Sequence, residues 1–460
     1  MTKGERSFWP ELLPRERRLL VLLGAASFFG QYDTQLFSLL LVQIQQDLAI
    51  PDAALGYLGS LTRLGALPAF GVLLLADRYG RRSVLLFTVA GYTLMTAATA
   101  LSPSYAWFVA CQFGASGFLA AELLLSLIVI VEEFRPGHRG WGVGVAGALA
   151  VLGRGLALGL FGFVEDIPFG WRGLYAVGVV PLLFLAVLRR RLPETRRFRA
   201  LVEAGPREAT RTRFLRPLGQ LARAYPARFA AVAGLGFLWS FSNAPVDFLL
   251  PKYAQQGLGW SPGEISRVAL GAGALGLLGL LVGGWVSDRF GRKPAFVVFL
   301  VLEPAFAIAL YTITGSFFVA LFVFWSFASV ANDTVGRTYT NEVFPTASRS
   351  TAAGARATVA AAGGVAGLAT ESLLVALFDT HWIAVRAIAA TGLAMPLLVG
   401  AALPETAGRT LETIAPEPAA PAPELARAEA TCAGGAGPAL TGPGGGPSPG
   451  RESAERGVVQ

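Results

Sequence analysis

Apolar stretches of about 20 residues recur from near residue 19 to near residue 403, and they constrain the fold more than any other feature. A helix of this length rises by about 1.5 Å per residue and crosses the roughly 30 Å of hydrocarbon in a bilayer. Only 15% of the residues are charged, whereas 53% are hydrophobic. The pattern predicts an all-α, multi-pass membrane protein with about twelve transmembrane helices.

The distribution of Lys and Arg tests this topology independently. Short loops that carry these residues stay on the cytoplasmic side of a membrane. Most of the 38 Lys and Arg lie in every second loop, and the opposite set of loops holds only Arg172, Lys252 and Arg267. We therefore expect a cytoplasmic-membrane protein with both termini in the cytoplasm. Topology also accounts for the net charge of +8, so we expect no nucleic-acid partner.

The chain contains an internal repeat. LADRYGRR at 75–82 returns as VSDRFGRK at 286–293, which places Asp77 and Asp288 211 residues apart. Two further sets keep this spacing to within one residue: Leu-Pro-Glu-Thr at 192–195 and 403–406, and the pairs Glu132/Arg139 and Glu342/Arg349. Such matches indicate a duplication. Because each copy holds six predicted spans, the halves are parallel repeats with the same topology.

These motifs resemble those of the major facilitator superfamily. The match covers the superfamily's signature loop after the second helix and its copy after the eighth: Asp77, Arg78, Gly80, Arg81, Arg82, and Asp288, Arg289, Gly291, Arg292, Lys293. The Leu-Pro-Glu-Thr pieces, with the loops ending in Arg139 and Arg349, resemble the sugar-porter and metabolite:proton symporter branch. The resemblance implies two pseudo-symmetric six-helix bundles that rock about a central site and open it to one side at a time.

The repeat and the composition divide the chain into five segments. We expect a cytoplasmic N-terminus at 1–18, six-helix bundles at 19–195 and 227–403, a cytoplasmic linker at 196–226, and a largely disordered tail at 404–460. The tail is rich in Pro, Gly, Ala and Glu and is too polar to form a core. Two cysteines suggest neither a disulfide framework nor a metal site, and we expect no cofactor and a monomer.

The resemblance also implies a role for the charged loops. Asp77 and Asp288 would hold the cytoplasmic side closed in the conformation that brings the bundles together there. The network that we call the cytoplasmic latch would further contain Arg78, Gly80, Arg81, Arg82, Arg289, Gly291, Arg292, Lys293, Glu132, Arg139, Glu342, Arg349, Glu194 and Glu405. In the alternative, these charges only set the topology and anchor lipid head groups.

Charged residues inside the spans are functional candidates, because a charge costs a few kcal/mol in the bilayer. Asp33 and Glu122 are our proton-coupling candidates, since a carboxyl shielded from water can take up a proton on one side and release it on the other. At a spacing of 210, the counterpart of Asp33 is Asn243, which cannot ionise. A structural hydrogen bond or a helix-pairing role is the alternative for Asp33.

Two arginines inside the spans are candidates for an anionic substrate. Arg63 and Arg154 would either contact it or neutralise the two acids within the N-terminal bundle, because a buried arginine needs a partner either way. Trp239 and Asn243 of the seventh span are candidates for lining a central cavity. Glu303 precedes a proline in the ninth span, which is usually peripheral in the fold that the chain resembles, and we leave it out of the site.

We therefore expect a secondary active transporter that couples protons to the symport of a small polar or anionic metabolite. The alternatives are a drug or metabolite efflux antiporter, an uncoupled facilitator, and a non-transporting receptor on the same scaffold. The chain has no G-x-x-x-x-G-K-[ST] phosphate loop, metal cluster or nucleophile with a recognisable base, so we expect neither an ATP-driven pump nor an enzyme.

Overall fold

The described part of the chain is helical. A computed structural model describes residues 11–190, 194–195, 218–313, 315 and 317–415, and within these residues it contains helices and no strand. The predicted N-terminus, linker and tail lie outside the described residues except for 11–18, 218–226 and 404–415.

The helices of the N-terminal half cover the first six predicted spans. They are α1 (Pro14–Leu39), α2 (Leu41–Asp47), η1 (Asp52–Ala54), α3 (Leu55–Leu64), α4 (Ala69–Tyr79), α5 (Arg81–Ala100), α6 (Tyr105–Glu133), α7 (Arg139–Phe161) and α8 (Trp171–Arg189).

The helices of the C-terminal half cover the last six. They are α11 (Pro226–Lys252), η2 (Tyr253–Gly257), α12 (Pro262–Gly276), α13 (Leu278–Phe290), α14 (Arg292–Leu310), α15 (Phe317–Glu342), η3 (Thr346–Ser348), α16 (Arg349–Phe378), α17 (His381–Thr391), η4 (Gly392–Ala394), α18 (Met395–Ala402) and α19 (Leu411–Ile414).

Within the described residues, ten helices are long and apolar enough to cross a membrane. α1 occupies the first predicted span, and its first turns carry Arg15, Glu16, Arg17 and Arg18. The second predicted span, 53–76, differs from the prediction because it divides into α3 and α4. Pro68 has no N–H to donate, and short turn bonds such as Ala66 N to Arg63 O (3.0 Å) replace the α-helical ladder there.

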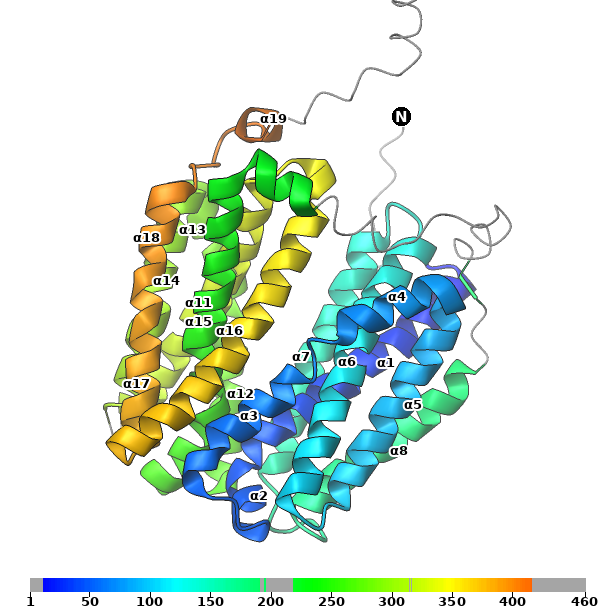
Figure 1. Ribbon diagram of the computed structural model, residues 1–460, viewed down its shortest axis with the longest axis vertical. Helices are drawn as coiled ribbons and strands as arrows, with labels where there is room; N and C mark the ends of the chain where they lie inside the picture. Colours follow the sequence, from blue (N-terminus) through cyan, green and yellow to red (C-terminus); the bar gives the residue numbers. More distant parts are fainter. Residues whose placement is uncertain (1–10, 191–193, 196–217, 314, 316, 416–460) are drawn as a thin grey trace, which may run out of the picture. The chain divides into compact units, whose positions relative to one another are not determined.

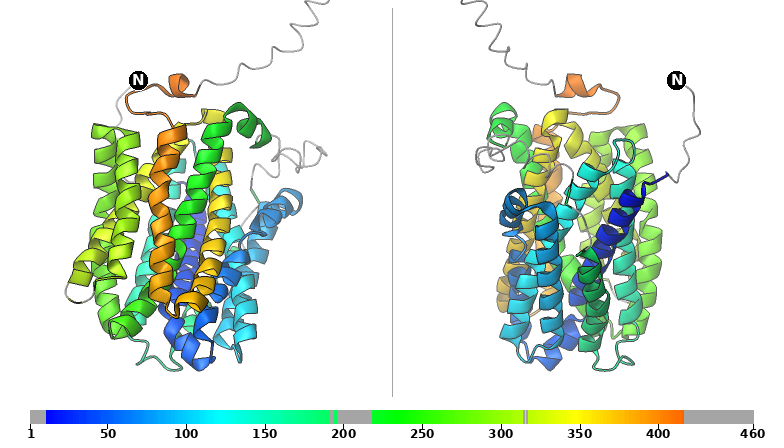
Figure 2. Two further views of the ribbon diagram at one scale, coloured as in Figure 1. Left: turned by 60° about the vertical axis from the view of Figure 1, so that its left-hand side comes forward. Right: turned by 90° about the vertical axis from the view of Figure 1, so that its right-hand side faces the viewer.

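The helices form two bundles, one from each half of the chain (Figure 1). Figure 2 shows that the long helices of both bundles run along a common direction. α1 packs on α7, and α11 packs on α16. A Cβ at Gly153 in α7 would lie 2.0 Å from Phe28 O, and one at Gly363 in α16 would lie 2.2 Å from Phe237 O. Glycine therefore permits the same close backbone approach in both copies of the repeat.

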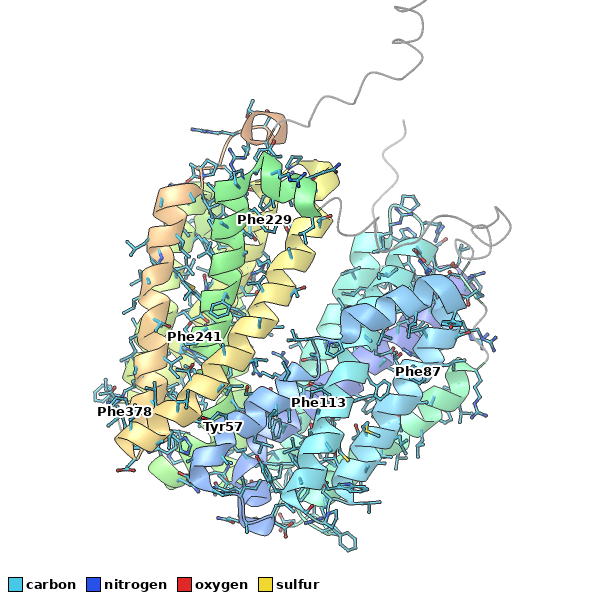
Figure 3. All side chains as sticks on the ribbon, viewed as in Figure 1. Tyr57, Phe87, Phe113, Phe229, Phe241 and Phe378 are labelled. Carbon is cyan, nitrogen blue, oxygen red and sulfur yellow. The ribbon has the colours of Figure 1, made fainter. Side chains whose placement is uncertain are left out.

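The outer faces carry large apolar side chains. Phe87 on α5 and Phe378 at the end of α16 are 56% and 44% exposed (Figure 3). Along α8, Val180, Phe184 and Val187 are exposed by more than half. Such a surface suits hydrocarbon rather than water, in agreement with an integral membrane protein.

Both signature loops turn on a glycine in the same backbone conformation. Gly80 joins α4 to α5 with φ 94° and ψ 150°, and Gly291 joins α13 to α14 with φ 106° and ψ 151°. A side chain is strained at such positive φ, which explains why glycine is present in each copy.

Candidate functional site

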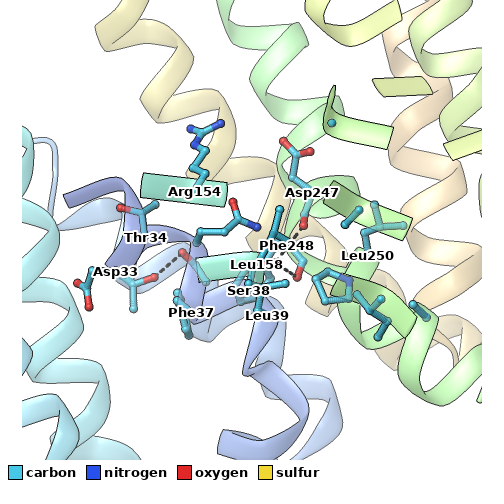
Figure 4. Close-up of a pocket in the computed structure, with 18 of the residues that line it drawn as sticks. Asp33, Thr34, Phe37, Ser38, Leu39, Arg154, Leu158, Asp247, Phe248 and Leu250 are labelled. Carbon is cyan, nitrogen blue, oxygen red and sulfur yellow. Dashed lines mark hydrogen bonds between the residues drawn. The ribbon is translucent and has the colours of Figure 1, made fainter. Parts of the chain in front are cut away.

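A cavity of about 390 Å³ lies between the bundles, within the range of small-molecule sites. Its N-terminal wall includes Asp33 of α1, Arg63 of α3 and Arg154 of α7. Its C-terminal wall includes Asp247 of α11 and a set of rings that we call the aromatic wall: Phe248, Trp260, Phe318, Phe322 and Trp325. Figure 4 shows Arg154 and Asp247 projecting from opposite bundles toward the same side of the cavity. The cavity thus combines charged side chains of both signs with apolar rings.

Within the described residues, the two arginines of the cavity form no ion pair with a carboxylate. Arg154 Nε donates to Gln31 Oε1 at 2.8 Å. The Arg63 guanidinium reaches across to α16, where a Cβ added at Gly364 would lie 3.0 Å from its Nη1. Asp247 interacts electrostatically with both arginines, but neither forms an ion pair within 4.0 Å of any described residue. Both positive charges therefore remain available to an anion.

Asp33 lies at the edge of the same cavity and is 5% exposed. Its Oδ2 accepts a hydrogen bond from Thr96 Oγ1 at 3.4 Å, and its carboxyl faces the hydroxyl of Tyr92. Oδ1 is buried and has no hydrogen-bond partner among the described residues. The cavity therefore contains both the proton-coupling candidate Asp33 and the anion-binding candidates Arg63 and Arg154. Neither arginine forms an ion pair with Asp33.

Glu122, the second proton candidate, lies away from the cavity inside the N-terminal bundle. It forms an ion pair with Arg189 of α8, and the two side chains are 1% and 0% exposed. Thr88 and Ser126 donate hydrogen bonds to its carboxylate at 2.6 and 3.1 Å. With a buried cation and two hydroxyl donors, this carboxylate is satisfied as a charged group.

Trp239 and Asn243 do not line the central cavity. Trp239 Nε1 and Asn243 Nδ2 both donate to the carboxyl of Glu303 in α14, at 3.2 and 2.9 Å. The predicted substrate residues of α11 therefore surround an acid that the sequence analysis left out of the site.

The contacts that the structure gives for residues of the cytoplasmic latch lie within their own bundles, in matching patterns. Arg81 Nε lies 3.4 Å from Glu132 and Arg292 Nε lies 3.4 Å from Glu342. The remaining contacts include Arg82 N to Glu194 and Lys293 N to Glu405, Arg292 to Asp288, Arg139 Nε to Phe134 O, and Arg349 Nε to Phe344 O. The side chains of Asp77 and Arg78 lie outside the described residues.

A second charged cluster, which the sequence analysis missed, joins the bundles at the opposite end. Asp52 of η1 accepts from Lys252 Nζ at 2.8 Å and lies 3.0 Å from His381 Nε2, and His381 Nδ1 contacts Glu371. We call these four residues the closing cluster. In the described part of the chain, the hydrogen bonds between the bundles join α1, α2, η1, α3 and α7 to α11, η2, α12 and α16.

Comparison with known proteins decides the family. The family model described as Major Facilitator Superfamily matches residues 23–280 and 232–436. The chain belongs to the major facilitator superfamily. It is a multi-pass membrane transporter of small molecules and not an enzyme, and the predicted all-α fold with two pseudo-symmetric bundles is confirmed.

Individual members of the superfamily match most of the chain. The niacin transporter NiaP of Acinetobacter baylyi is 27% identical over 432 residues, covering 86% of this chain and 95% of that protein. The 4-hydroxybenzoate transporter PcaK of Pseudomonas aeruginosa is 28% identical over 325 residues, covering 64% and 71%. The crystal structure of a D-xylose-proton symporter shares the fold with a TM-score of 0.69 at 18% identity, covering 86% of this chain and 100% of that one.

Proposed function

We propose that this member of the superfamily is a proton-coupled symporter for a small aromatic carboxylate. The observation that carries the proposal is the pair Arg63 and Arg154, two cations that form no ion pair with any described residue and that share one cavity with the aromatic wall. The names of two relatives refer to niacin and 4-hydroxybenzoate, which are both aromatic acids. The proposal includes a monomer in the cytoplasmic membrane with both termini in the cytoplasm.

The cavity suits such a substrate chemically. A carboxylate near the two guanidinium groups would form charge-assisted hydrogen bonds, which arginine makes in pairs. The ring would stack on the aromatic wall, where apolar area and ring geometry both stabilise binding. Trp325 Nε1 is buried and has no acceptor among the described residues, so it is a donor for a polar ring substituent.

Asp33 is the proposed proton carrier. Its carboxyl is buried beside the cavity with one oxygen unpaired and with no cation at ion-pair distance in the described chain. A buried carboxylate needs a counter-charge or several hydrogen bonds, which this position does not supply. A protonated carboxyl needs fewer such partners. The proton and the substrate anion would then enter the cavity together, and their charges would cancel.

Alternating access follows from the two charged ends. With the termini in the cytoplasm, the closing cluster would seal the outer side while the latch residues stay within their own bundles. In the opposite state the latch residues of the two bundles would meet. The transport test below also decides between uptake and export. One relative, 28% identical over 60% of this chain, is the cephamycin export protein CmcT of Amycolatopsis lactamdurans.

The test is proton flux into proteoliposomes that contain a pH dye, with nicotinate, 4-hydroxybenzoate, xylose and a lipophilic cation outside. We expect acidification with the two aromatic acids only. Asp33→Asn should reduce acidification per substrate but keep counterflow exchange of labelled substrate. Arg154→Gln should abolish both, whereas Arg267→Gln, which removes an exposed arginine of α12, should change neither.

Each opposing outcome overturns a stated part. Transport of xylose but of neither acid overturns the substrate class. Uptake of the acids without acidification identifies an uncoupled facilitator. Substrate movement in the direction opposite to proton movement identifies an antiporter. Acidification that is unchanged in Asp33→Asn removes Asp33 from the coupling step.

A further inference from the structure

Glu303 lies at the centre of a polar cluster inside the C-terminal bundle and is 0% exposed. Its carboxyl accepts from Trp239 Nε1 at 3.2 Å, Asn243 Nδ2 at 2.9 Å and the side-chain amide of Asn332. All three donors are neutral, and the described residues place no cation at ion-pair distance. We propose that Glu303 is a second proton-binding site of the transporter, in addition to Asp33.

Glu122 supplies an internal comparison, because it is an equally buried glutamate in the other bundle. The two glutamates have different partners: Glu122 faces Arg189, and Glu303 faces amides and an indole. A buried carboxylate without a cation is costly, and such a group generally binds a proton instead. Glu303, unlike Glu122, is therefore in surroundings that favour the protonated acid.

The elements packed against α14 bring no counter-charge. From α11 the charged group that acts on Glu303 is Asp247, which is itself an acid. From α15, Asp333 and Arg337 pair with each other at 2.7 Å. In α13, Asp288 pairs with Arg292; in α17, Arg386 donates to Trp382 O and Thr312; η4 and α18 contain no ionisable residue.

In the internal repeat, Glu303 corresponds to Tyr92, the residue that faces Asp33 in the N-terminal bundle. Asp33 of α1 faces Tyr92 of α5. Adding 210 and 211 to these numbers gives Asn243 of α11 and Glu303 of α14, which contact each other. Each bundle thus holds one carboxyl without a cation where its first and third spans meet, and the acid has changed helix between the two halves.

The cluster also contains an acceptor and space for a water. Asn332 Oδ1 is buried without a donor among the described residues, and a proton on Glu303 would supply one close by. A cavity of about 20 Å³ touches Trp239 and Asn332 on one side and Asp333 and Arg356 on the other. One water needs about 10–15 Å³. The side chain of Asp333, which also lines this cavity, is 37% exposed.

The test of protonation is an infrared difference titration of the protein in lipid, which needs no transport. We expect a carboxylic-acid C=O band that is absent from Glu303→Gln and present in Asp33→Asn. Trp239→Phe should shift the frequency of this band, because one donor to the carboxyl is gone. A spectrum of Glu303→Gln identical to that of the native protein overturns the proposal, and an unaltered melting temperature shows that the variant is folded.

The role in transport rests on the proposed function and is tested by the proton-to-substrate ratio, measured from the reversal potential with 4-hydroxybenzoate. We expect two protons per substrate in the native protein and one in Glu303→Gln, which should still acidify the liposomes. An unchanged ratio overturns the coupling role. If the infrared band is assigned to Glu303 but no substrate acidifies the liposomes, the proposed function fails while the proton site stands.

Discussion

At the scale of single residues, three of the acids inside the bundles differ in what faces them. Glu122 faces Arg189, Asp33 has an unpaired oxygen at the edge of the central cavity, and Glu303 is held by amides and an indole. Burial is similar in all three, so it does not separate a structural acid from a coupling acid. The partner does, because it decides whether the charged or the neutral form is compensated.

The first prediction concerns the Glu122–Arg189 pair. Glu122→Gln should destabilise the protein by about 3–5 kcal/mol, because it leaves Arg189 buried without a counter-charge. Thermal unfolding in detergent measures this loss. Glu122→Gln with Arg189→Met should recover most of the stability, since the unpaired charge is gone. Unchanged unfolding together with lost proton coupling in Glu122→Gln would contradict this structural role.

The second prediction concerns the space that Gly364 leaves for Arg63. In Gly364→Ala the new Cβ would lie 3.0 Å from Arg63 Nη1 and 2.8 Å from Ser240 Oγ, both ends of side chains that can move. The fold should therefore survive, while the displaced guanidinium binds the carboxylate less well. We expect the KM for 4-hydroxybenzoate to rise several-fold with little change in kcat. A matched change at Gly354, where a Cβ meets nothing within 4 Å, should leave KM unaltered.

At the scale of helices, the repeated Leu-Pro-Glu-Thr segment caps a distant helix. Glu405 accepts hydrogen bonds from the first backbone N–H groups of α14, Arg292 N at 2.9 Å and Lys293 N at 3.0 Å. Glu194 accepts in the same way from Arg82 N at the start of α5, at 3.1 Å. A carboxylate is stabilised at the positive end of the helix dipole, which gives this repeated motif a structural role.

The third prediction uses the pH dependence of this cap. Burial raises the pKa of the Glu405 carboxyl, but four backbone N–H donors outweigh it and hold the pKa below the ordinary value of 4.5. A lowered pKa in the folded state stabilises the protein above the unfolded-state pKa, and this stabilisation is lost as the pH falls through the folded value. Glu405→Gln should therefore lower the melting temperature at neutral pH and converge with the native protein in acid. A constant difference across the pH series would contradict the role of the charge.

The sequence predicts those features of the fold and of the site that leave a regular pattern in it. The spans, the repeat and the charged candidates Asp33, Arg63 and Arg154 follow from hydropathy, spacing and charge, because lipid imposes these patterns on any sequence. The rotation of a helix about its axis leaves no such pattern. For this reason Trp239 and Asn243 were expected at the central cavity but face Glu303 instead. Pro68 could have predicted the break in the second span, but the apolar run continues across this proline and indicated one uninterrupted helix.

At the scale of the whole molecule, the closing cluster joins the two bundles through four ionisable side chains. Lys252, His381 and Glu371 are at most 2% exposed, and all three belong to the C-terminal bundle. Asp52 is the contribution of the N-terminal bundle, so the contact depends on this residue. The contact with His381 is the main cause that holds the pKa of Asp52 well below its ordinary value; burial opposes it, and Lys252 and Gln45 reinforce it. The carboxylate is therefore charged, and the contact complete, at neutral pH.

The fourth prediction is that Asp52→Asn weakens closure at this end. A hydrogen bond to a charged group contributes about 1.5 kcal/mol or more, so the population open at this end should rise by at least about tenfold. Spin labels at Leu101 and Gln256, which are exposed and belong to opposite bundles, report it as a longer distance. The matched control is Asp47→Asn, which breaks a pair with Arg172 inside one bundle and should leave the distances unchanged. Identical distances in both variants would mean that packing between the bundles, rather than the closing cluster, holds this end shut.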